Sequence, residues 1–85
     1  MSMITGMQIR SARAALRWSV QRLAEAAGVG TQTIKRFEVV EGIPHSRTQT
    51  LLDIKAALES AGIEFIGTPE DRPGIRLSPP AKAGK

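Results

Sequence analysis

Residues 20–38, VQRLAEAAGVGTQTIKRFE, decide the fold of this chain. Apolar residues recur there at helical spacing on both sides of two glycines, which predicts two short helices joined by the turn Gly28-Val29-Gly30. Gly28 can adopt the left-handed conformation that ends a helix, and Gly30 is an acceptable N-cap for the second helix, with Thr31 sharing that role. The residues predicted to pack the two helices together are Leu23, Ala24, Ala27, Ile34 and Phe37.

This pattern resembles the helix-turn-helix of the Cro and phage-repressor type, which defines the XRE family of transcriptional regulators. With Val20 as the first position of the ~20-residue unit, Ala24 is the small residue where the helices cross and Gly28 is the turn glycine. The resemblance covers residues 5–61 and implies a mainly α, four-helix Cro/C1-repressor-like domain over residues 1–62, with DNA as its ligand. The chain departs from the family at Val20, where a glutamine is common.

The composition is that of one small domain. A chain of 85 residues with 41% hydrophobic content can bury one modest core. It has no cysteine, and its single histidine, His45, is predicted to be a loop residue, so we expect neither a disulfide nor a metal site and no cofactor. No apolar run reaches the ~20 residues that span a bilayer, and the first residues lack a signal-peptide pattern. We therefore expect a cytoplasmic protein with no membrane partner.

Charge is segregated along the chain, which has a net charge of +4. Residues 1–47 contain seven Lys or Arg and three Glu, a balance of +4, and residues 48–71 contain one Lys and five Asp or Glu, a balance of −4. Residues 72–85 add four Lys or Arg and no acidic residue. The first, basic segment contains the predicted pair of helices, which favours a polyanionic ligand there.

The second helix of the pair carries long polar side chains on the side opposite its apolar stripe. At helical spacing, Gln32, Lys35 and Arg36 project away from Ile34 together, and Thr31 stands at the start of the helix. Arginine or lysine suits guanine edges and glutamine suits adenine, whereas a threonine can also cap the helix or bind phosphate. For Lys35 and Arg36 the alternative is an ordinary solvated helix face. The predicted base contacts are Thr31, Gln32, Lys35 and Arg36.

Four further residues are predicted to touch the DNA backbone, two near the start of each of two helices. Ser19 is a good N-cap, and Trp18 and Leu23 have the spacing of a hydrophobic staple across it. Ser46 and Gln49 predict a capping box at the start of a later helix. The predicted backbone contacts are Ser19, Gln21, Arg47 and Thr48.

The helix that precedes the pair is predicted to start at Thr5, which forms a capping-box pattern with Gln8. Its inward stripe is Ile9, Ala12 and Leu16.

Three arginines lie along one flank of that first helix. We expect Arg10 and Arg17 to belong to a solvated face. Arg13 differs, because Glu38 leans toward the inner side of its own helix and needs a partner. The family pairs an arginine with a glutamate at these positions, so the resemblance implies a structural ion pair between Arg13 and Glu38.

The last part of the chain changes from helical to alternating periodicity. A helix with the stripe Leu51, Ile54, Leu58 and Ala61 is predicted to stop at Gly62. Residues 63–77 then predict a β-hairpin, and residues 78–85 a disordered basic tail.

A lone two-stranded hairpin is marginally stable, so it must pack on the helices, pair with a second subunit, or do both. We expect it to form the dimer; the alternative is a hairpin folded over its own helices. The predicted dimerisation residues are Leu52, Ile63, Phe65, Ile75 and Leu77.

No nucleophile, base and orienting group form a catalytic pattern, so we do not expect an enzyme. The sequence predicts a sequence-specific double-stranded DNA-binding regulator, a repressor or autoregulator, that acts as a homodimer on a palindromic operator. The alternative is a protein-interaction module such as an antitoxin or antiactivator, whose protein partner replaces DNA as the main ligand. The outward Gln32, Lys35 and Arg36 favour DNA.

Overall fold

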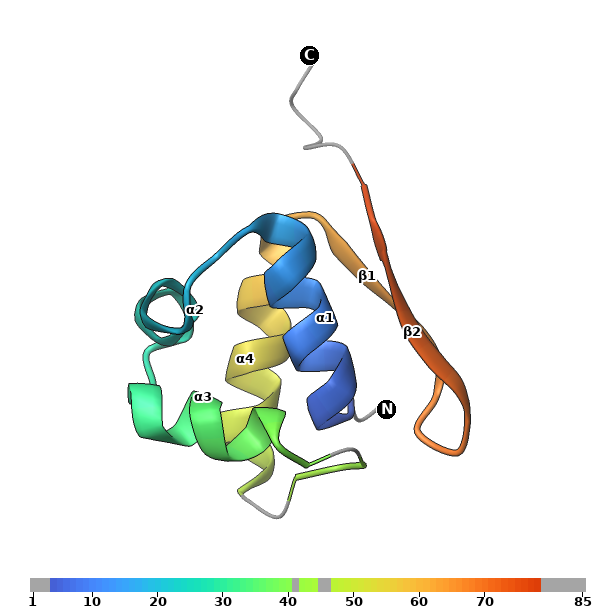
Figure 1. Ribbon diagram of the computed structural model, residues 1–85, viewed down its shortest axis with the longest axis horizontal. Coiled ribbons are helices and arrows are strands. Elements are labelled where there is room, and N and C mark those ends of the chain that lie inside the picture. Colours follow the sequence, from blue (N-terminus) through green and yellow to red (C-terminus); the bar gives the residue numbers. More distant parts are fainter. Residues whose placement is uncertain (1–3, 41, 45–46, 79–85) are drawn as a thin grey trace.

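The computed structural model describes residues 4–40, 42–44 and 47–78. The fold is mainly α, as predicted: four helices are followed by a two-stranded antiparallel hairpin. In Figure 1, α1 and α4 lie together at the centre, with α2 and α3 on one side and the hairpin on the other. The elements are α1 (Gly6–Leu16), α2 (Val20–Ala27), α3 (Thr31–Glu38), α4 (Thr48–Ser60), β1 (Ile63–Thr68) and β2 (Asp71–Leu77).

Some predictions concern residues outside this part of the chain. They are the loop position of His45, the side chain of Ser46, and the disordered tail from residue 79 onward. Ser78, predicted as the first residue of that tail, is described: its backbone amide donates to the Gly62 carbonyl (2.7 Å), so the tail does not begin there. Within residues 4–40, 42–44 and 47–78, no helix has both the length and the apolar character needed to cross a membrane.

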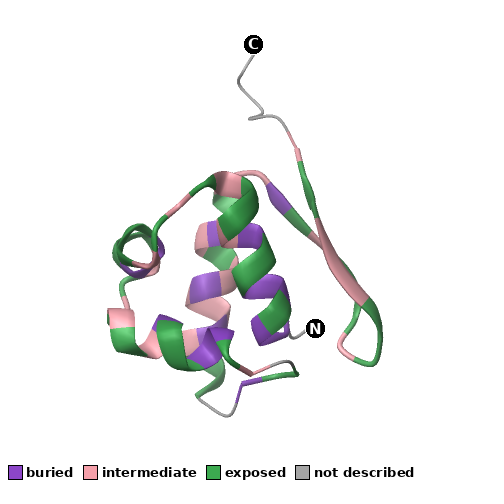
Figure 2. Ribbon diagram, viewed as in Figure 1, coloured by how far each residue is buried: buried purple, intermediate pink, exposed green. Residues whose placement is uncertain are grey.

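The core forms where the apolar stripes of the four helices meet, as the inward purple segments of Figure 2 show. The predicted stripes are confirmed except at one position: most of their members are buried, and Leu16 and Ala27 are partly buried against them. Ala61, predicted in the stripe of α4, is the C-cap of that helix and is only half-buried. The buried apolar residues are Ile4, Ile9, Ala12, Leu23, Ala24, Ile34, Phe37, Leu51, Ile54, Leu58 and Ile63.

Side chains cap the first two helices as their sequences predict. Thr5 is the N-cap of α1: its hydroxyl accepts from the backbone N–H of Gln8 (3.0 Å), and the side-chain oxygen of Gln8 accepts from the backbone N–H of Thr5 (2.9 Å). Ser19 caps α2 by accepting from the amide of Arg22 (3.0 Å). These bonds satisfy amide groups that a helix start leaves without intrahelical partners.

The start of α4 differs from its prediction. Its N-cap is Arg47, which makes no side-chain capping bond. Gln49 is therefore the second helical residue and not the third, so its side chain is not placed to complete a capping box. Instead its amide nitrogen donates to Asp53 at 2.8 Å, one turn further along α4.

The hairpin lies against the helices of its own chain. Ile63 pairs with Leu77 and Phe65 with Ile75, and both strands extend beyond the predicted apolar positions, to Thr68 and from Asp71. Phe65 and Ile75 pack against the core, and Ile63 is 3% exposed within it. The helices of its own chain therefore already cover the Ile63 side chain, and a dimer contact by this residue stays a prediction.

One buried side chain ties α1 to both strands. The side-chain nitrogen of Gln8 (Nε2) donates to the backbone carbonyl oxygens of Gly74 (2.8 Å) and Ile66 (3.3 Å). Because Gln8 is 3% exposed, these bonds form away from water, where unsatisfied polar groups are costly. The hairpin is thus fixed to the first turn of α1.

Candidate nucleic-acid interface

The turn between α2 and α3 sets the relative position of these two helices. Gly28 has φ 74°, the left-handed conformation expected at this helix end, and its amide donates to the carbonyl of Ala24 (2.9 Å). The amide of Val29 donates to the same carbonyl (3.0 Å), and Val29 packs against the core. Gly30 then begins α3 as its N-cap, as predicted.

The two sides of α3 differ in burial and chemistry. Ile34 and Phe37 are buried, whereas Gln32, Lys35 and Arg36 are exposed on the outward side. Neither Lys35 nor Arg36 forms an ion pair with an acidic residue in the described part of the chain.

The start of α3 has open amide groups. The amides of Thr33 and Ile34 donate to the Gly30 carbonyl (3.1 and 3.3 Å), but those of Thr31 and Gln32 meet no acceptor among the described residues. Thr31 is half-buried and makes no capping bond, so the expectation that it shares the N-cap role is wrong. Open amides at the positive end of a helix dipole suit an anion such as a phosphate.

The residues predicted to touch the DNA backbone differ in whether their side chains are exposed and free of other hydrogen bonds. Ser19, Arg47 and Thr48 are exposed at the starts of α2 and α4. The Ser19 hydroxyl accepts from an amide and keeps its own proton for a further acceptor. Gln21 is exposed, but its amide nitrogen donates to the carboxylate of Glu25 (3.3 Å), which places a negative charge beside it.

Three acidic groups outside α3 have cationic partners on the same helix or on the same hairpin. On α4, Glu59 pairs with Lys55 (2.7 Å). On the hairpin, Glu64 pairs with Arg76 (3.2 Å) and Asp71 with Arg72 (3.1 Å). These pairs place the three carboxylates on α4 and on the hairpin, not on α3.

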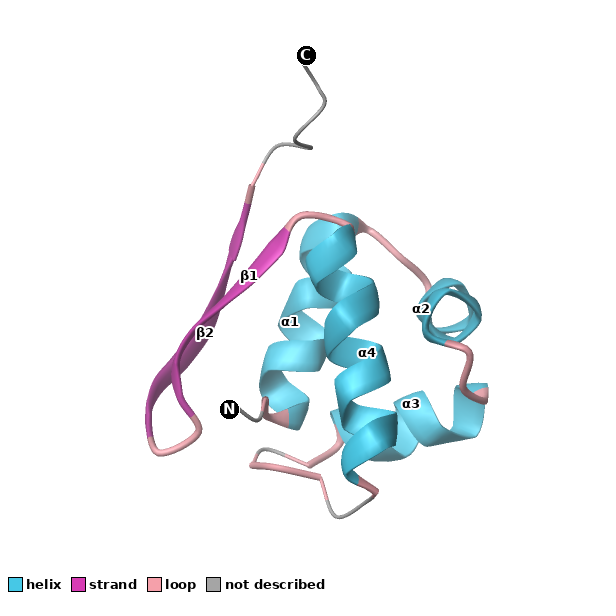
Figure 3. Ribbon diagram, turned by 180° about the vertical axis from the view of Figure 1, so that it is seen from behind, coloured by secondary structure: helices cyan, strands magenta, loops and turns pink. Residues whose placement is uncertain are grey.

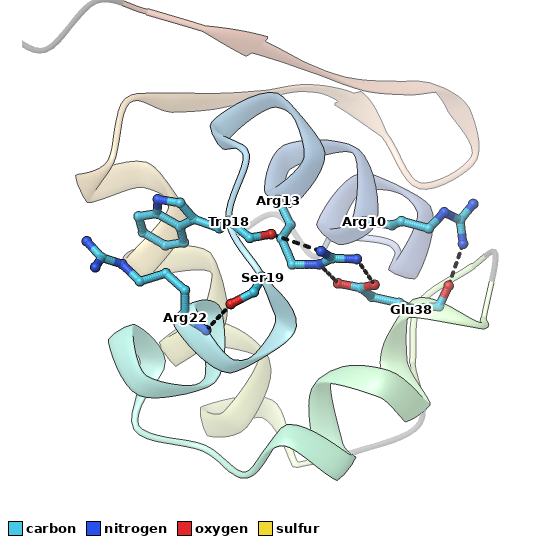
Figure 4. Close-up of polar contacts among 6 residues, drawn as sticks. All are labelled: Arg10, Arg13, Trp18, Ser19, Arg22 and Glu38. Atoms are coloured by element: carbon cyan, nitrogen blue, oxygen red, sulfur yellow. Dashed lines mark hydrogen bonds and ion pairs between the residues drawn. The ribbon is translucent and has the colours of Figure 1, made fainter.

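The ion pair between α1 and α3 is present (Figure 4). The Arg13 guanidinium donates to both carboxylate oxygens of Glu38, at 2.7 and 2.9 Å, and its remaining nitrogen donates to the carbonyl of Trp18 at 2.9 Å. Glu38 is 7% exposed. Its hydrogen bond and charge raise the pKa of the Arg13 guanidinium above the ordinary value, although partial burial opposes that shift.

Arginine contacts that the sequence did not predict include those of Arg10, Arg22 and Arg36; the Arg36 guanidinium lies 5.8 Å from the centroid of the Phe37 ring. The Arg10 guanidinium donates to the backbone carbonyl of Glu38, while the Arg10 side chain is exposed, as expected for a solvated face. Arg22 lies 5.1 Å from the centroid of the Trp18 ring, within the range of a cation–π contact. The i, i+4 spacing from Trp18 to Arg22 was a signal for the contact of Arg22, whereas no local pattern indicates that of Arg10.

No protein-family model and no curated protein sequence matches this chain. Within the described ranges, no group of three or more His, Cys, Asp or Glu side chains could hold a metal ion. The candidate site is therefore defined by its geometry and by the resemblance of its sequence pattern.

Proposed function

We propose that this protein is a sequence-specific double-stranded DNA-binding regulator with a helix-turn-helix of the Cro and phage-repressor type. In this proposal α3 enters the major groove and α2 lies across the DNA backbone, as in other helix-turn-helix proteins. The observation that carries the proposal is the outward side of α3, where Gln32, Lys35 and Arg36 are exposed together, with no carboxylate partner among the described residues.

The chemistry of these side chains suits base edges. Arg36 and Lys35 can donate to the O6 and N7 acceptors of guanine, and Gln32 can form the paired donor and acceptor bonds that adenine offers. A helix face that is exposed only to solvent typically carries charges of both signs, which form ion pairs along the helix. α3 has no acidic residue except the inward Glu38. The outward side is therefore uniformly suited to an anionic, acceptor-rich surface.

Backbone phosphates would be held by groups around this helix. The open amides of Thr31 and Gln32, the hydroxyl of Ser19, and the exposed side chains of Arg47 and Thr48 supply donors at the starts of three helices. Such contacts fix the orientation of the protein on the duplex without selecting its sequence.

We further propose that the protein acts as a homodimer on a palindromic operator. One short helix reads only a few base pairs, whereas two helices held ~34–36 Å apart read successive major-groove faces on one side of the duplex. The hairpin offers strand edges for pairing with a second copy. Leu77 is 48% exposed at the end of β2, and Leu52 is half-buried on α4, so these two side chains can contribute to such an interface.

The proposal is tested by selecting duplexes from a random DNA pool and then measuring the affinity of variants for the selected sequence. Gln32→Ala and Arg36→Ala should each cost ~1–3 kcal/mol on that sequence and relax the choice of base, with a smaller effect on random DNA. Arg76→Ala removes the same charge as Arg36→Ala but from the hairpin, so it serves as the matched control.

Two results would contradict the assignment. If the α3 variants lost affinity for selected and random DNA equally, these side chains would contact phosphate and not bases. If the purified protein enriched no sequence, double-stranded DNA would not be its specific ligand.

A protein-interaction module of the antitoxin or antiactivator kind is the second candidate. The observation that favours it is Val39, which is 78% exposed directly after α3, with Ile43 40% exposed nearby in the chain. Apolar side chains in such positions suit a protein surface better than a phosphate. Val39→Ser would weaken capture of such a partner and leave DNA affinity unchanged, which separates the two functions.

A further inference from the structure

The last residue of α3 is held at two separate points by α1. Arg13 binds the carboxylate of Glu38, and Arg10, one helical turn earlier, donates to the backbone carbonyl of the same residue (Figure 4). The first contact is one that the resemblance implies. The second is a contact to the backbone and does not depend on the Glu38 side chain.

The end of α3 needs such a contact. The last four carbonyl groups of a helix lack intrahelical partners, and this end carries the negative pole of the helix dipole. α2 ends in a left-handed glycine, Gly28, but α3 continues into Val39, which has φ −85° and ψ −6° and gives no such stop. A guanidinium from another helix can bind a terminal carbonyl and oppose the charge of the dipole.

The same helix also contacts the chain just before α2. Arg13 donates to the carbonyl of Trp18, the residue that precedes the N-cap Ser19. α1 therefore fixes the entry to α2 through Arg13 and the exit from α3 through both Arg10 and Arg13. The orientation of α3 relative to α2 is set at the two outer ends of the pair as well as at its turn.

From this geometry we infer that Arg10 is a positioning residue for α3: its bond to the Glu38 carbonyl orients the base-reading side of the helix without touching DNA. The inference rests on the proposed function for the part that concerns bases. Its structural part, that Arg10 restrains the end of α3, stands on the contact alone.

The inference is tested with Arg10→Ala, Arg10→Lys and the control Arg17→Gln, which removes the same charge from the far end of α1. The first readout needs no DNA: amide hydrogen exchange in the free, folded protein. Arg10→Ala should speed exchange at residues 36–40 and leave α2 unchanged, whereas Arg17→Gln should leave residues 36–40 unchanged. Unchanged exchange at residues 36–40 in Arg10→Ala would overturn the inference.

The second readout is DNA binding at a temperature where every variant is folded. Arg10→Ala should lower the preference for the selected duplex over a single-base variant by about three- to tenfold, the net effect of losing one ordinary hydrogen bond, because Arg10 is exposed and water weakens its contact. Arg10→Lys keeps the charge and one donor, so it should recover part of that preference. The salt dependence of binding should not change, because Arg10 is not expected to replace a counterion on DNA.

The outcomes separate the inference from the proposed function. If the wild-type protein selects DNA but Arg10→Ala keeps full preference, Arg10 does not position the reading side. If affinity for all DNA falls and the salt slope drops by about one, Arg10 contacts a phosphate directly and the inference is wrong. If the wild-type protein selects no DNA, the proposed function fails, and the exchange measurement still decides whether Arg10 restrains α3.

Discussion

Arg13→Ala tests the contact network that joins α1 to the pair of helices. The substitution removes the two hydrogen bonds to the Glu38 carboxylate, at 2.7 and 2.9 Å, and the bond to the Trp18 carbonyl at 2.9 Å. Glu38, 7% exposed, is left buried without its cation. The cost therefore includes a stranded charge in addition to the lost bonds.

The size of the destabilisation by Arg13→Ala follows from the burial of its ion pair. Removing one partner of a buried ion pair typically costs about 3–5 kcal/mol. The Arg13 side chain is 22% exposed, so water can reach part of the vacated space, and we expect the lower end, about 3 kcal/mol. At about 4–8 °C per kcal/mol for a domain of this size, the melting temperature should fall by roughly 12–24 °C.

The dependence of this contribution on pH has a definite sign. Bonding to Glu38 raises the pKa of Arg13 in the folded state. The arginine's contribution is therefore present below its unfolded-state pKa and is lost only as pH rises through the higher folded-state pKa. Because arginine titrates far above neutrality, the loss on its account occurs only in strong alkali.

The assay is thermal and urea unfolding followed by circular dichroism, in a double-mutant cycle with Glu38→Ala. The two single variants should each destabilise the protein, and the double variant by less than their sum, because no stranded charge remains. Arg76→Ala is the control: its pair with Glu64 is exposed at 64% and 55%, and such pairs contribute ~0–1 kcal/mol. If Arg13→Ala had the same melting temperature as the control, the contacts of Arg13 would not stabilise the position of α3. The same would follow if the free-energy changes of the two single variants added up to that of the double variant.

Two further predictions concern close packing and assembly. Gly6→Ala should destabilise the protein by more than about 2 kcal/mol despite the better helix propensity of alanine, because the new Cβ would lie 2.0 Å from the Val40 carbonyl oxygen. Gly42→Ala is the control, because a Cβ there would meet no atom within 4 Å beyond its chain neighbours, and stability should change by less than about 0.5 kcal/mol. Equal melting temperatures for the two variants would contradict this packing. Leu77→Ser should weaken dimerisation in sedimentation experiments while retaining helical content, whereas an unchanged dimer would place the interface elsewhere.

Local pattern predicted most of the helical fold. The apolar spacing and glycines of residues 20–38 were sufficient to place α2, the turn and α3, because helix period and the left-handed stop at Gly28 are properties of short segments. The capping box of Thr5 and Gln8 was found for the same reason. The cap predicted at the start of α4 failed because a shift of one residue is enough to move Gln49 out of reach.

Contacts between distant segments were not predictable in the same way. Gln8 bonds to Gly74, 66 residues away, and Arg10 to Glu38, 28 residues away, and neither leaves a periodic signal in the sequence. The alternation of the hairpin indicated an apolar face but not whether α1 and α4 or a second subunit would cover Ile63. For the candidate site, helix period predicted which side chains of α3 face outward; whether they contact bases stays a prediction.

The central claim is that the outward side of α3 contacts DNA bases. The most direct measurement is a titration of isotope-labelled protein with the selected duplex, following the backbone amide resonances. The largest shift changes should occur at residues 30–36, with smaller changes at Ser19 and at residues 47–48, where phosphate contacts are proposed. If the largest changes instead occurred at residues 39–43 or within residues 63–77, while residues 30–36 stayed unchanged, the protein would not read DNA through α3.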